Sequence, residues 1–320
     1  MKTVPVIPVI IDRHAEDAAF LWLLRDAAVA APNYSLDDLA ELDNRLDAHL
    51  DGLRVAGEAG WEVCKAALEI GEPGEFFTAA FLAFDSSDGG RIDEVLSAAQ
   101  GSRENLAAVV SALGWQEFAS IEPLASVFCN ANQAIYNYLG LSAFAIHRAD
   151  PGPALERFLS SDNPMIRARS LKAVGELQRH DLLPLLPDYW EAADEASRFW
   201  SVWSAVLLGN REAALRLKIF VGPDSSYAEA ALNLLARVLD GESARNWLSG
   251  LARQEDKRRY ALIGAGLSGD PLYIPSLLNQ MADPAHARVA GEGFSMITGA
   301  DLAYLDLDAD WPDDFEAGPT

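Results

Sequence analysis

Residues 161–177 have the sequence SDNPMIRARSLKAVGEL, and this stretch decides the fold. Asp162 or Asn163 can cap a helix that begins at Pro164, where the missing backbone N–H costs little. After a turn at 178–181, the leucine-rich and proline-containing segment 182–186 predicts a second apolar helix. The stretch therefore predicts a helical hairpin. Small and apolar residues recur at helical spacing along its first helix, namely Ile166, Ser170, Ala173, Val174 and Leu177.

This hairpin resembles a HEAT repeat. The resemblance rests on Pro164-Met165-Ile166-Arg167 after an Asp, on Lys172-Ala173-Val174-Gly175, and on a second segment rich in Leu and Pro. HEAT hairpins stack side by side, and each one buries its apolar face on its neighbours. The resemblance implies a fold and no particular activity.

The small-residue landmark of this hairpin recurs about every 30 residues, with one longer step near the start. Such a period is the signature of stacked helical hairpins. We therefore predict an all-α fold, an α-solenoid of seven or eight HEAT-like hairpins from about Ala15 to Gly299. The landmarks are Ala66–Gly71, Ser111–Gly114, Ser142–Ala145, Lys172–Gly175, Ser204–Gly209, Leu232–Ala236, Ala261–Gly266 and Ser295–Gly299.

Three regions are predicted: N-terminal capping helices at 1–56, the HEAT-repeat solenoid at 57–300, and an acidic linker or tail at 301–320. Within the first region, an extended start is followed by a helix from Ala15 to Ala30. A second helix opens at Ser35 with a capping box, in which the Ser35 and Asp38 side chains bond each other's backbone N–H. A leucine stripe is predicted on that helix, formed by Leu36, Leu39, Leu42, Leu46, Leu50 and Leu53.

The tail 301–320 carries seven acidic residues, no basic residue and two prolines. Such a segment offers little apolar surface to offset the entropy lost on ordering. We expect it to pack weakly, so that removal of residues 306–320 leaves the melting temperature nearly unchanged. A loss of several degrees would instead indicate that the tail is docked, with the basic run Arg253, Lys257, Arg258 and Arg259 as the first candidate site.

The net charge of −23 bears on possible partners. A surface this acidic repels phosphate backbones and disfavours nucleic-acid binding, while it attracts cationic proteins. No uninterrupted apolar run approaches the ~18 residues of a membrane span. We expect a soluble, cytoplasmic protein with no membrane contact.

The sequence contains no recognisable catalytic, cofactor or metal motif. None of the five histidines is followed by Glu, and Cys64 and Cys129 lack the spacing of zinc ligands, so both thiols are expected in the core. The glycines of 264–269 follow no strand, which disfavours a phosphate loop. Arg167 is expected to form part of a structural ladder between repeats. We therefore predict no enzymatic activity, no metal and no cofactor.

The whole chain also resembles a group of bacterial HEAT-repeat proteins encoded among type VI secretion genes. The resemblance rests on three stretches: 9–22, VIIDRHAEDAAFLW; 36–53, LDDLAELDNRLDAHLDGL; and 294–302, FSMITGADL. Members of that group extend further at the C-terminus. The resemblance implies an accessory protein that holds a secreted effector, or an immunity protein that neutralises one.

Two functions stay open from the sequence. The first is a non-enzymatic scaffold that binds a protein, such as a basic effector or secretion component, through a concave face made by successive second helices. The second is a HEAT-like enzyme of lyase type acting on a small molecule, which a pocket with converging His, Asp and Arg would favour. The residues predicted to bind the partner are Glu156, Arg157, Asp188, Tyr189, Arg216, Lys218, Asn246, Asn279 and Gln280.

Overall fold

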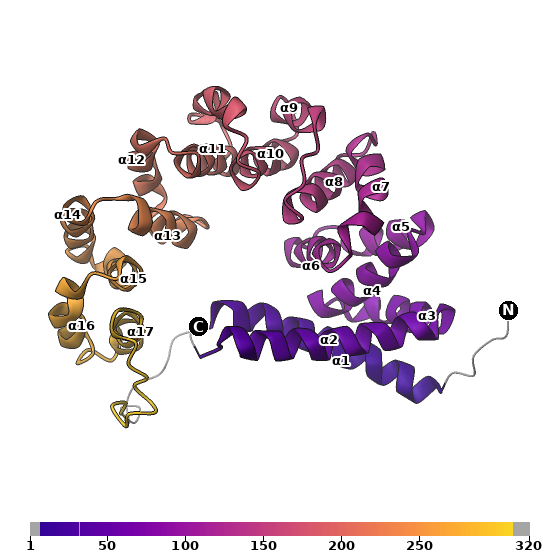
Figure 1. Ribbon diagram of the computed structural model, residues 1–320, viewed down its shortest axis with the longest axis horizontal. Coiled ribbons are helices and arrows are strands. Elements are labelled where there is room, and N and C mark those ends of the chain that lie inside the picture. Colours follow the sequence, from indigo (N-terminus) through magenta and orange to yellow (C-terminus); the bar gives the residue numbers. More distant parts are fainter. Residues whose placement is uncertain (1–6, 32, 310–320) are drawn as a thin grey trace. The chain divides into compact units, whose positions relative to one another are not determined.

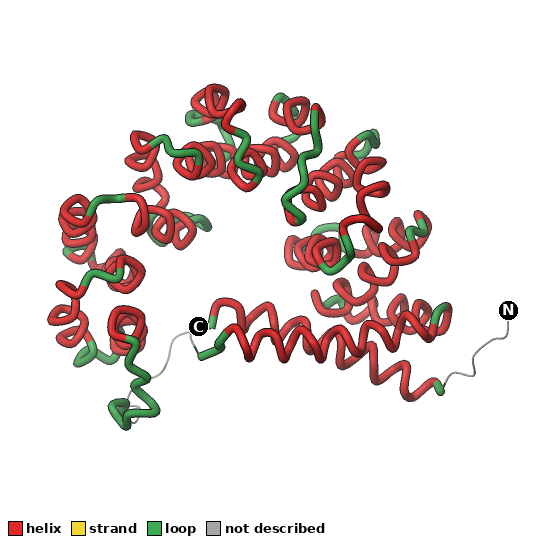
Figure 2. Tube along the Cα trace, viewed as in Figure 1, coloured by secondary structure: helices red, strands yellow, loops and turns green. Residues whose placement is uncertain are grey.

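The computed structural model describes residues 7–31 and 33–309. All regular secondary structure in these residues is helical, and no strand occurs among them (Figure 2). This confirms the predicted all-α class. The chain divides into two compact units, unit 1 at Met1–Leu177 and unit 2 at Gln178–Thr320. Each unit is described by itself.

Unit 1 is built around a row of helices in which α1 packs on α4, α4 on α6, α6 on α8, and α8 on α10 (Figure 1). Helix α2 packs along α1, while α5, α7 and α9 contact α4, α8 and α10 respectively. The elements are α1 (Pro8–Ala30), α2 (Leu36–Ala56), α3 (Glu58–Ala67), the 3-10 helix η1 (Leu68–Ile70), α4 (Pro73–Ser86), α5 (Gly89–Ala98), α6 (Arg103–Gly114), α7 (Phe118–Cys129), α8 (Ala134–Ile146), α9 (Pro153–Leu159) and α10 (Pro164–Glu176).

The first helix begins earlier than predicted. It starts at Pro8 rather than Ala15, because proline suits the first turn of a helix and Ile11 finds a buried position one turn later. The expected extended start was therefore wrong for residues 8–14, and residues 1–6 lie outside the described part.

Helix α2 confirms the predicted capping box, with hydrogen bonds in both directions between Ser35 and Asp38. The predicted leucine stripe holds for Leu42, Leu46, Leu50 and Leu53, all of them buried. It does not hold for Leu36, which is 84% exposed at the first turn of α2.

The stretch that decides the fold forms α10 as predicted. Asn163, rather than Asp162, caps it by accepting hydrogen bonds from Met165 N (3.0 Å) and Ile166 N (3.5 Å). The second half of the predicted hairpin differs. Residues 180–189 form a 3-10 helix, η2, because Pro184 and Pro187 lack the N–H groups that an α-helix needs there.

Unit 2 contains two rows of helices. In Figure 1, helices α11, α13, α15 and α17 lie on the inside of the bend that this unit makes, while α12, α14 and α16 lie outside it. The elements are η2 (His180–Tyr189), α11 (Glu195–Leu207), η3 (Arg211–Ala213), α12 (Ala214–Leu217), η4 (Lys218–Phe220), α13 (Ala228–Val238), α14 (Gly241–Ala252), η5 (Glu255–Lys257), α15 (Arg258–Ser268), η6 (Pro271–Tyr273), α16 (Ile274–Gln280) and α17 (Ala287–Thr298).

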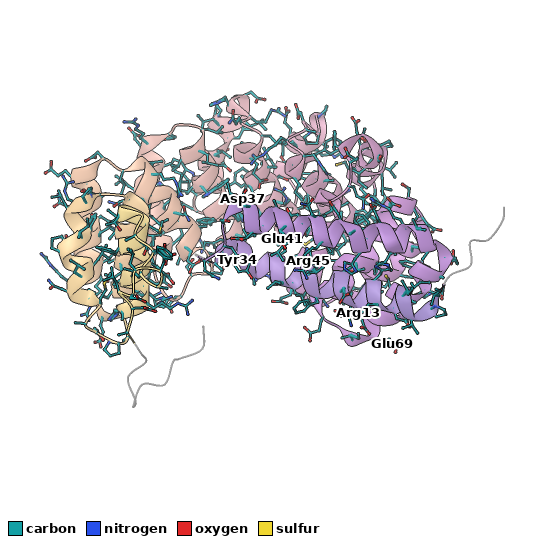
Figure 3. All side chains as sticks on the ribbon, turned by 60° about the horizontal axis from the view of Figure 1, so that its bottom comes forward. Arg13, Tyr34, Asp37, Glu41, Arg45 and Glu69 are labelled. Carbon is teal, nitrogen blue, oxygen red and sulfur yellow. The ribbon has the colours of Figure 1, made fainter. Side chains whose placement is uncertain are left out.

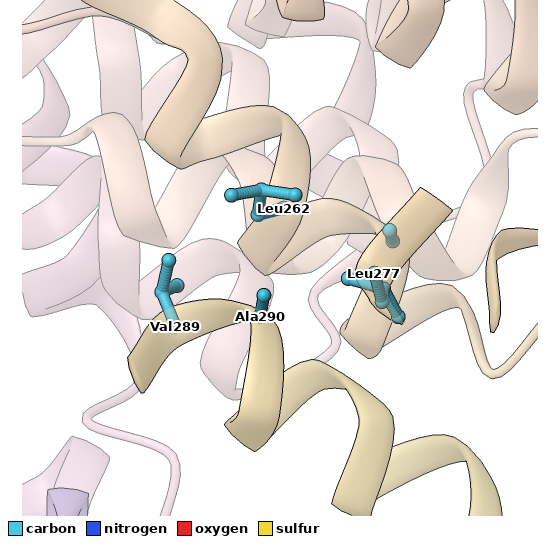
Figure 4. Packing of buried hydrophobic residues seen from close by; sticks show 5 residues of the cluster. Leu262, Leu277, Val289 and Ala290 are labelled. Atoms are coloured by element: carbon cyan, nitrogen blue, oxygen red, sulfur yellow. The ribbon is translucent and has the colours of Figure 1, made fainter. Parts of the chain in front are cut away.

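We call the second of these rows the outer row and define it as η2, α12 with η4, α14, and η6 with α16. Its members pack against the long helices: η2 and α12 contact α11, α14 contacts α15, and α16 contacts α17. At the C-terminal end, Leu262 of α15, Leu277 of α16 and Val289 and Ala290 of α17 form one buried cluster (Figure 4). The outer row therefore contributes one side of the core and leaves its other side to solvent.

Each unit has an aromatic centre. In unit 1, Phe77 is fully buried and stacks on Trp22 with 5.2 Å between ring centroids. In unit 2, Phe199 is fully buried and stacks on Tyr227 at 4.3 Å. Of the aromatic residues that the sequence places at 189–203, only Phe199 is fully buried; Tyr189, Trp190, Trp200 and Trp203 are half-buried.

Helices α7 and α8 approach so closely that one position must be glycine. A Cβ atom on Gly140 would lie 2.7 Å from Ala125 O and 2.7 Å from Cys129 N, both backbone atoms of α7. Neither atom can move without displacing a helix. We expect Gly140→Ala to lower the free energy of unfolding by about 1–3 kcal/mol, as overpacking does, in a urea titration.

Gly250→Ala on α14 is the matched control, because a Cβ there meets no atom within 4 Å. It should stabilise the protein by about 0.5–1 kcal/mol through helix propensity alone. Equal effects at the two positions would contradict the close approach of α7 and α8.

The described part of the tail, 301–309, forms turns held by local hydrogen bonds such as Leu307 N to Leu302 O (2.9 Å). Tyr304 is 85% and Leu307 64% exposed. Among the described residues, no ion pair joins Asp301, Asp306 or Asp308 to the basic run at 253–259. The prediction for residues 310–320 lies outside the described part.

Both cysteines are buried and unbridged, as predicted. Burial raises the pKa of the Cys64 thiol to about 12 and that of Cys129 to about 11. They are therefore uncharged packing residues. In the described part of the chain, no helix combines the length and the apolar character needed to cross a bilayer.

Candidate functional site

The nine predicted site residues divide between the two units. Glu156 and Arg157 lie on α9 of unit 1, and the other seven lie on the outer row of unit 2. Arg157 has a structural role: its Nη2 donates to Cys129 O of α7 (2.6 Å), and its guanidinium lies 4.9 Å from the Phe158 ring. Glu156 is exposed on the same helix.

Two cations of the outer row lie over tryptophan rings of neighbouring segments. The Arg216 guanidinium on α12 lies 4.6 Å from the ring centroid of Trp190, and its Nη1 donates to Glu191 Oε1 (3.0 Å). Lys218 Nζ on η4 lies 5.5 Å from the ring of Trp247 on α14. The segment α12–η4 is thus joined by cation–π contacts to the segment before it and the segment after it.

Large aliphatic side chains lie exposed along the same row. On α12–η4, Leu215 is 62% and Ile219 74% exposed, one turn apart, beside the two stacked cations. Leu185 on η2, Leu272 on η6 and Leu278 on α16 are 44%, 69% and 50% exposed. Apolar residues therefore face solvent on three of the four outer segments.

Sequence reasoning missed these leucines because it assigned every apolar residue of a second helix to the core. The spacing of Ala213, Ala214, Leu217 and Phe220, which are buried, already completes one apolar face of α12–η4. The positions left over include Leu215 and Ile219. These additional apolar positions, outside the buried face, could have indicated an exposed apolar surface from the sequence alone.

The remaining predicted residues have different surroundings. Asp188 on η2, Asn246 on α14 and Asn279 on α16 are exposed, and Tyr189 is half-buried. Gln280 does not face solvent freely, because its Oε1 is buried and has no hydrogen-bond partner among the described residues. The expected placement of the second helices on a concave side does not describe unit 2, where Figure 1 shows them outside the bend.

The net negative charge is larger in the first helices of unit 1 than in unit 2. Residues 8–98, from α1 to α5, carry 19 acidic and six basic residues, whereas residues 178–300 of unit 2 carry 15 and 12. Figure 3 shows Asp37, Glu41 and Arg45 along one side of α2. Further along that helix, burial, followed by the charges of Asp51 and Asp43, raises the pKa of Asp47.

A pocket of about 360 Å³ lies in unit 2 between the end of α13, the start of α14, the end of α15 and the short helix η6. Its polar lining residues include Arg237, Asp270 and Tyr273, and no histidine lines it. Asp270 Oδ2 accepts from Arg245 Nη1 (2.7 Å), whereas the Tyr273 hydroxyl is buried without a described partner. The combination of His, Asp and Arg that would favour an enzyme is therefore incomplete in this pocket.

Four of the five histidines make packing or capping contacts, and the fifth, His180, is exposed. His147 Nε2 lies 2.9 Å from Leu113 O, and His286 Nδ1 lies 2.7 Å from Asp283 Oδ2. His14 and His49 meet between α1 and α2, with 3.1 Å between their Nδ1 atoms. Among the described residues, no group of three or more His, Cys, Asp or Glu side chains could hold a metal ion.

The His14–His49 contact gives unit 1 an acid-sensitive point. Burial, and secondarily His14, Arg45 and Arg13, lowers the pKa of His49 below its ordinary 6.5, against the opposing charge of Asp17. The unfolded chain therefore binds a proton at a higher pH than the folded chain does, so stability falls as pH drops below 6.5 towards the folded pKa. We expect His49→Gln to remove this part of the pH dependence in urea titrations between pH 7.5 and 5. An unchanged slope would contradict it.

No protein-family model matches this chain, and no curated protein matches it either. The resemblances to HEAT repeats and to the type VI secretion group stay predictions.

Proposed function

We propose that this chain is a non-enzymatic scaffold of stacked HEAT-like hairpins that binds a protein partner through the outer row of unit 2. The observation that supports it best is the pairing of exposed apolar side chains with aromatic–cation contacts on successive segments. Interfaces are enriched in such tryptophan and arginine anchors, and contiguous exposed apolar surface marks binding sites.

A recurring arginine supports the HEAT-like part of this proposal. Arg167, Arg198 and Arg258 occupy the first turn of α10, α11 and α15, at separations of 31 and 60 residues. Each donates to the carbonyl oxygen of the residue six positions earlier: Ser161 (2.9 Å), Ala192 (2.7 Å) and Ala252 (3.5 Å). A repeat array places the same contact at equivalent positions of its repeats, and separations of 31 and 60 residues fit one and two repeats of about 30 residues.

The outer row suits an apolar segment of a partner. Leu215 and Ile219 stand on the side of α12–η4 opposite its buried residues, with Arg216 and Lys218 between them. A partner that covers both aliphatic side chains would also desolvate the two cation–π pairs, which strengthens them. Asp188, Tyr189, Asn246 and Asn279 then supply polar contacts around this centre, as a rim does.

The partner's charge follows from the acidic helices α1 to α5. With 19 acidic and six basic residues at 8–98, this part of the chain attracts a basic protein and raises its rate of encounter. The partner we propose is a basic effector or secretion component of a type VI system, held by a cytoplasmic accessory or immunity protein. Its genomic setting rests on the sequence resemblance alone.

The test is affinity purification from the native organism, identification of the co-purified protein, and titration of that protein against variants. The double variant Leu215→Ser, Ile219→Ser should lose about 1–3 kcal/mol of binding free energy if these residues are hot spots. Asp188→Ala with Tyr189→Ala should weaken binding in the same direction.

The matched control is Leu36→Ser with Val55→Ser, which removes two aliphatic side chains that are 84% and 74% exposed on α2 of unit 1. It should bind with wild-type affinity. Full affinity in the outer-row variant would refute the assigned surface. If no protein co-purifies and a small molecule does, the alternative of a solenoid enzyme replaces this proposal.

A further inference from the structure

The solvent-facing side of helix α1 carries residues at the spacing that helices use to pack on one another. These residues, which we call the α1 seam, alternate steps of four and three positions: Val9, Arg13, Glu16, Phe20, Leu23 and Ala27. All of them are exposed, with Val9 at 75%, Phe20 at 62% and Leu23 at 38%. Arg13, labelled in Figure 3, marks the side of α1 on which they lie. The buried residues of α1 lie on its other sides, so unit 1 does not use the seam in its own core.

The spacing of the seam fits a second helix. Residues three and four positions apart form one row along a helix, and such a row packs into the groove between the rows of another helix. Val9 and Ala27 are 18 residues apart, which corresponds to about 27 Å of helix. Phe20, Leu23 and Ala27 are three consecutive apolar positions in the C-terminal half. The seam therefore offers an apolar centre and a length of five turns to a helical partner.

The charges around the seam determine which helix fits it. Three exposed carboxylates of α1 form no ion pair among the described residues: Asp12, Glu16 and Asp26. Glu16 belongs to the seam, and each of the other two follows a seam residue by three positions and so neighbours it on the helix surface. The arginines of α1 are already paired, Arg13 Nε with Asp17 Oδ2 (2.8 Å) and Arg25 Nε with Asp43 Oδ1 (2.9 Å). The uncompensated charge beside the seam is therefore negative.

We propose that the α1 seam binds a basic amphipathic helix of a partner protein. The apolar side of that helix covers Phe20 and Leu23, and its flanking Lys or Arg side chains reach the three carboxylates. A second copy of this chain would bring the same carboxylates together, and an anionic lipid surface would be repelled by them. The seam lies on α1 of unit 1, so this inference does not depend on the outer row of unit 2.

The test is a fluorescence anisotropy titration of the full chain with a labelled peptide of three heptads, which has Leu at positions a and d and Lys at e and g. A peptide with Glu in place of every Lys should bind about tenfold more weakly or not at all. The double variant Phe20→Ser, Leu23→Ser, which keeps every charge, should weaken the Lys peptide about fivefold or more. Asp12→Asn with Glu16→Gln should weaken it about threefold, and added salt should reduce this difference.

Two matched controls should bind the Lys peptide as the wild type does. Leu36→Ser with Val55→Ser removes exposed aliphatic side chains of α2 that lie outside the seam. Leu215→Ser with Ile219→Ser removes the centre of the outer row, so its normal peptide binding separates this inference from the proposed function. Phe20→Ser alone tests the seam if the double variant unfolds.

Three results would overturn the inference: absence of binding of the Lys peptide, equal binding of the Glu peptide, or equal losses in the seam variant and the α2 control. A dimer in sedimentation velocity that the seam variant dissociates would show instead that a second copy covers the seam. Binding to phosphatidylglycerol vesicles that the seam variant abolishes would assign it to a lipid surface. Either result also overturns the inference.

Discussion

Phe77→Ala is expected to lower the free energy of unfolding by about 3–5 kcal/mol, the range measured for removal of a buried phenylalanine. Phe77 on α4 is fully buried. Its ring stacks on Trp22 of α1 at 5.2 Å and meets Trp115 edge-on at 5.7 Å. The substitution therefore leaves a cavity in the core of unit 1, and it removes three aromatic contacts, the third being with Phe81 at 6.4 Å.

Phe20→Ala is the control for this experiment. Phe20 lies on α1 and is 62% exposed, so its loss should cost less than about 0.5 kcal/mol, as is usual for a surface change. Urea titrations followed by circular dichroism measure both variants. A loss below about 1 kcal/mol for Phe77→Ala would show that α4 does not pack on α1 as described.

Arg169→Met is expected to lower the free energy of unfolding by about 2–4 kcal/mol. Arg169 on α10 is 9% exposed; its Nε donates to Ser142 Oγ of α8 (3.0 Å), and its Nη1 to Glu176 Oε2 (2.7 Å). Removing one partner of a buried pair leaves the other uncompensated, which costs about 3–5 kcal/mol. The loss expected for Arg169→Met is lower than this range because Lys172 Nζ, 3.5 Å from Glu176 Oε1, also compensates the carboxylate charge.

The control for Arg169 is Arg13→Met on α1. Arg13 Nε donates to Asp17 Oδ2 at 2.8 Å, a similar distance, but the Arg13 side chain is 71% exposed. Pairs of this kind contribute about 0–1 kcal/mol. Equal losses of unfolding free energy in the two variants would contradict the claim that burial makes the Arg169–Glu176 pair more important for stability than the exposed Arg13–Asp17 pair.

Local chemistry made the helices predictable. The cap at Asn163 and the box at Ser35 and Asp38 depend on a few adjacent residues, and both formed where expected. The 3-10 form of η2 also follows from local sequence, because Pro184 and Pro187 exclude an α-helix there. The prediction of an α-helix was wrong because it gave the leucines of 182–186 more weight than these prolines.

The candidate surface was less predictable because it depends on which side of a segment a neighbour covers. The sequence identified Arg216 and Lys218, yet nothing local shows that Trp190 and Trp247 lie beneath them. Leu215 and Ile219 were missed for the same reason. Which row lies outside the bend of unit 2 depends on the size of contacts between successive helices, and a single hairpin does not reveal it.

The recurring arginine contact also has a consequence for how the chain folds. Each of Arg167, Arg198 and Arg258 reaches a carbonyl only six residues back, so the loop closed by the contact is short. Short loops close quickly and lose little chain entropy. Such contacts can form before distant helices meet, so these three turns are ordered by interactions that do not depend on the rest of the fold.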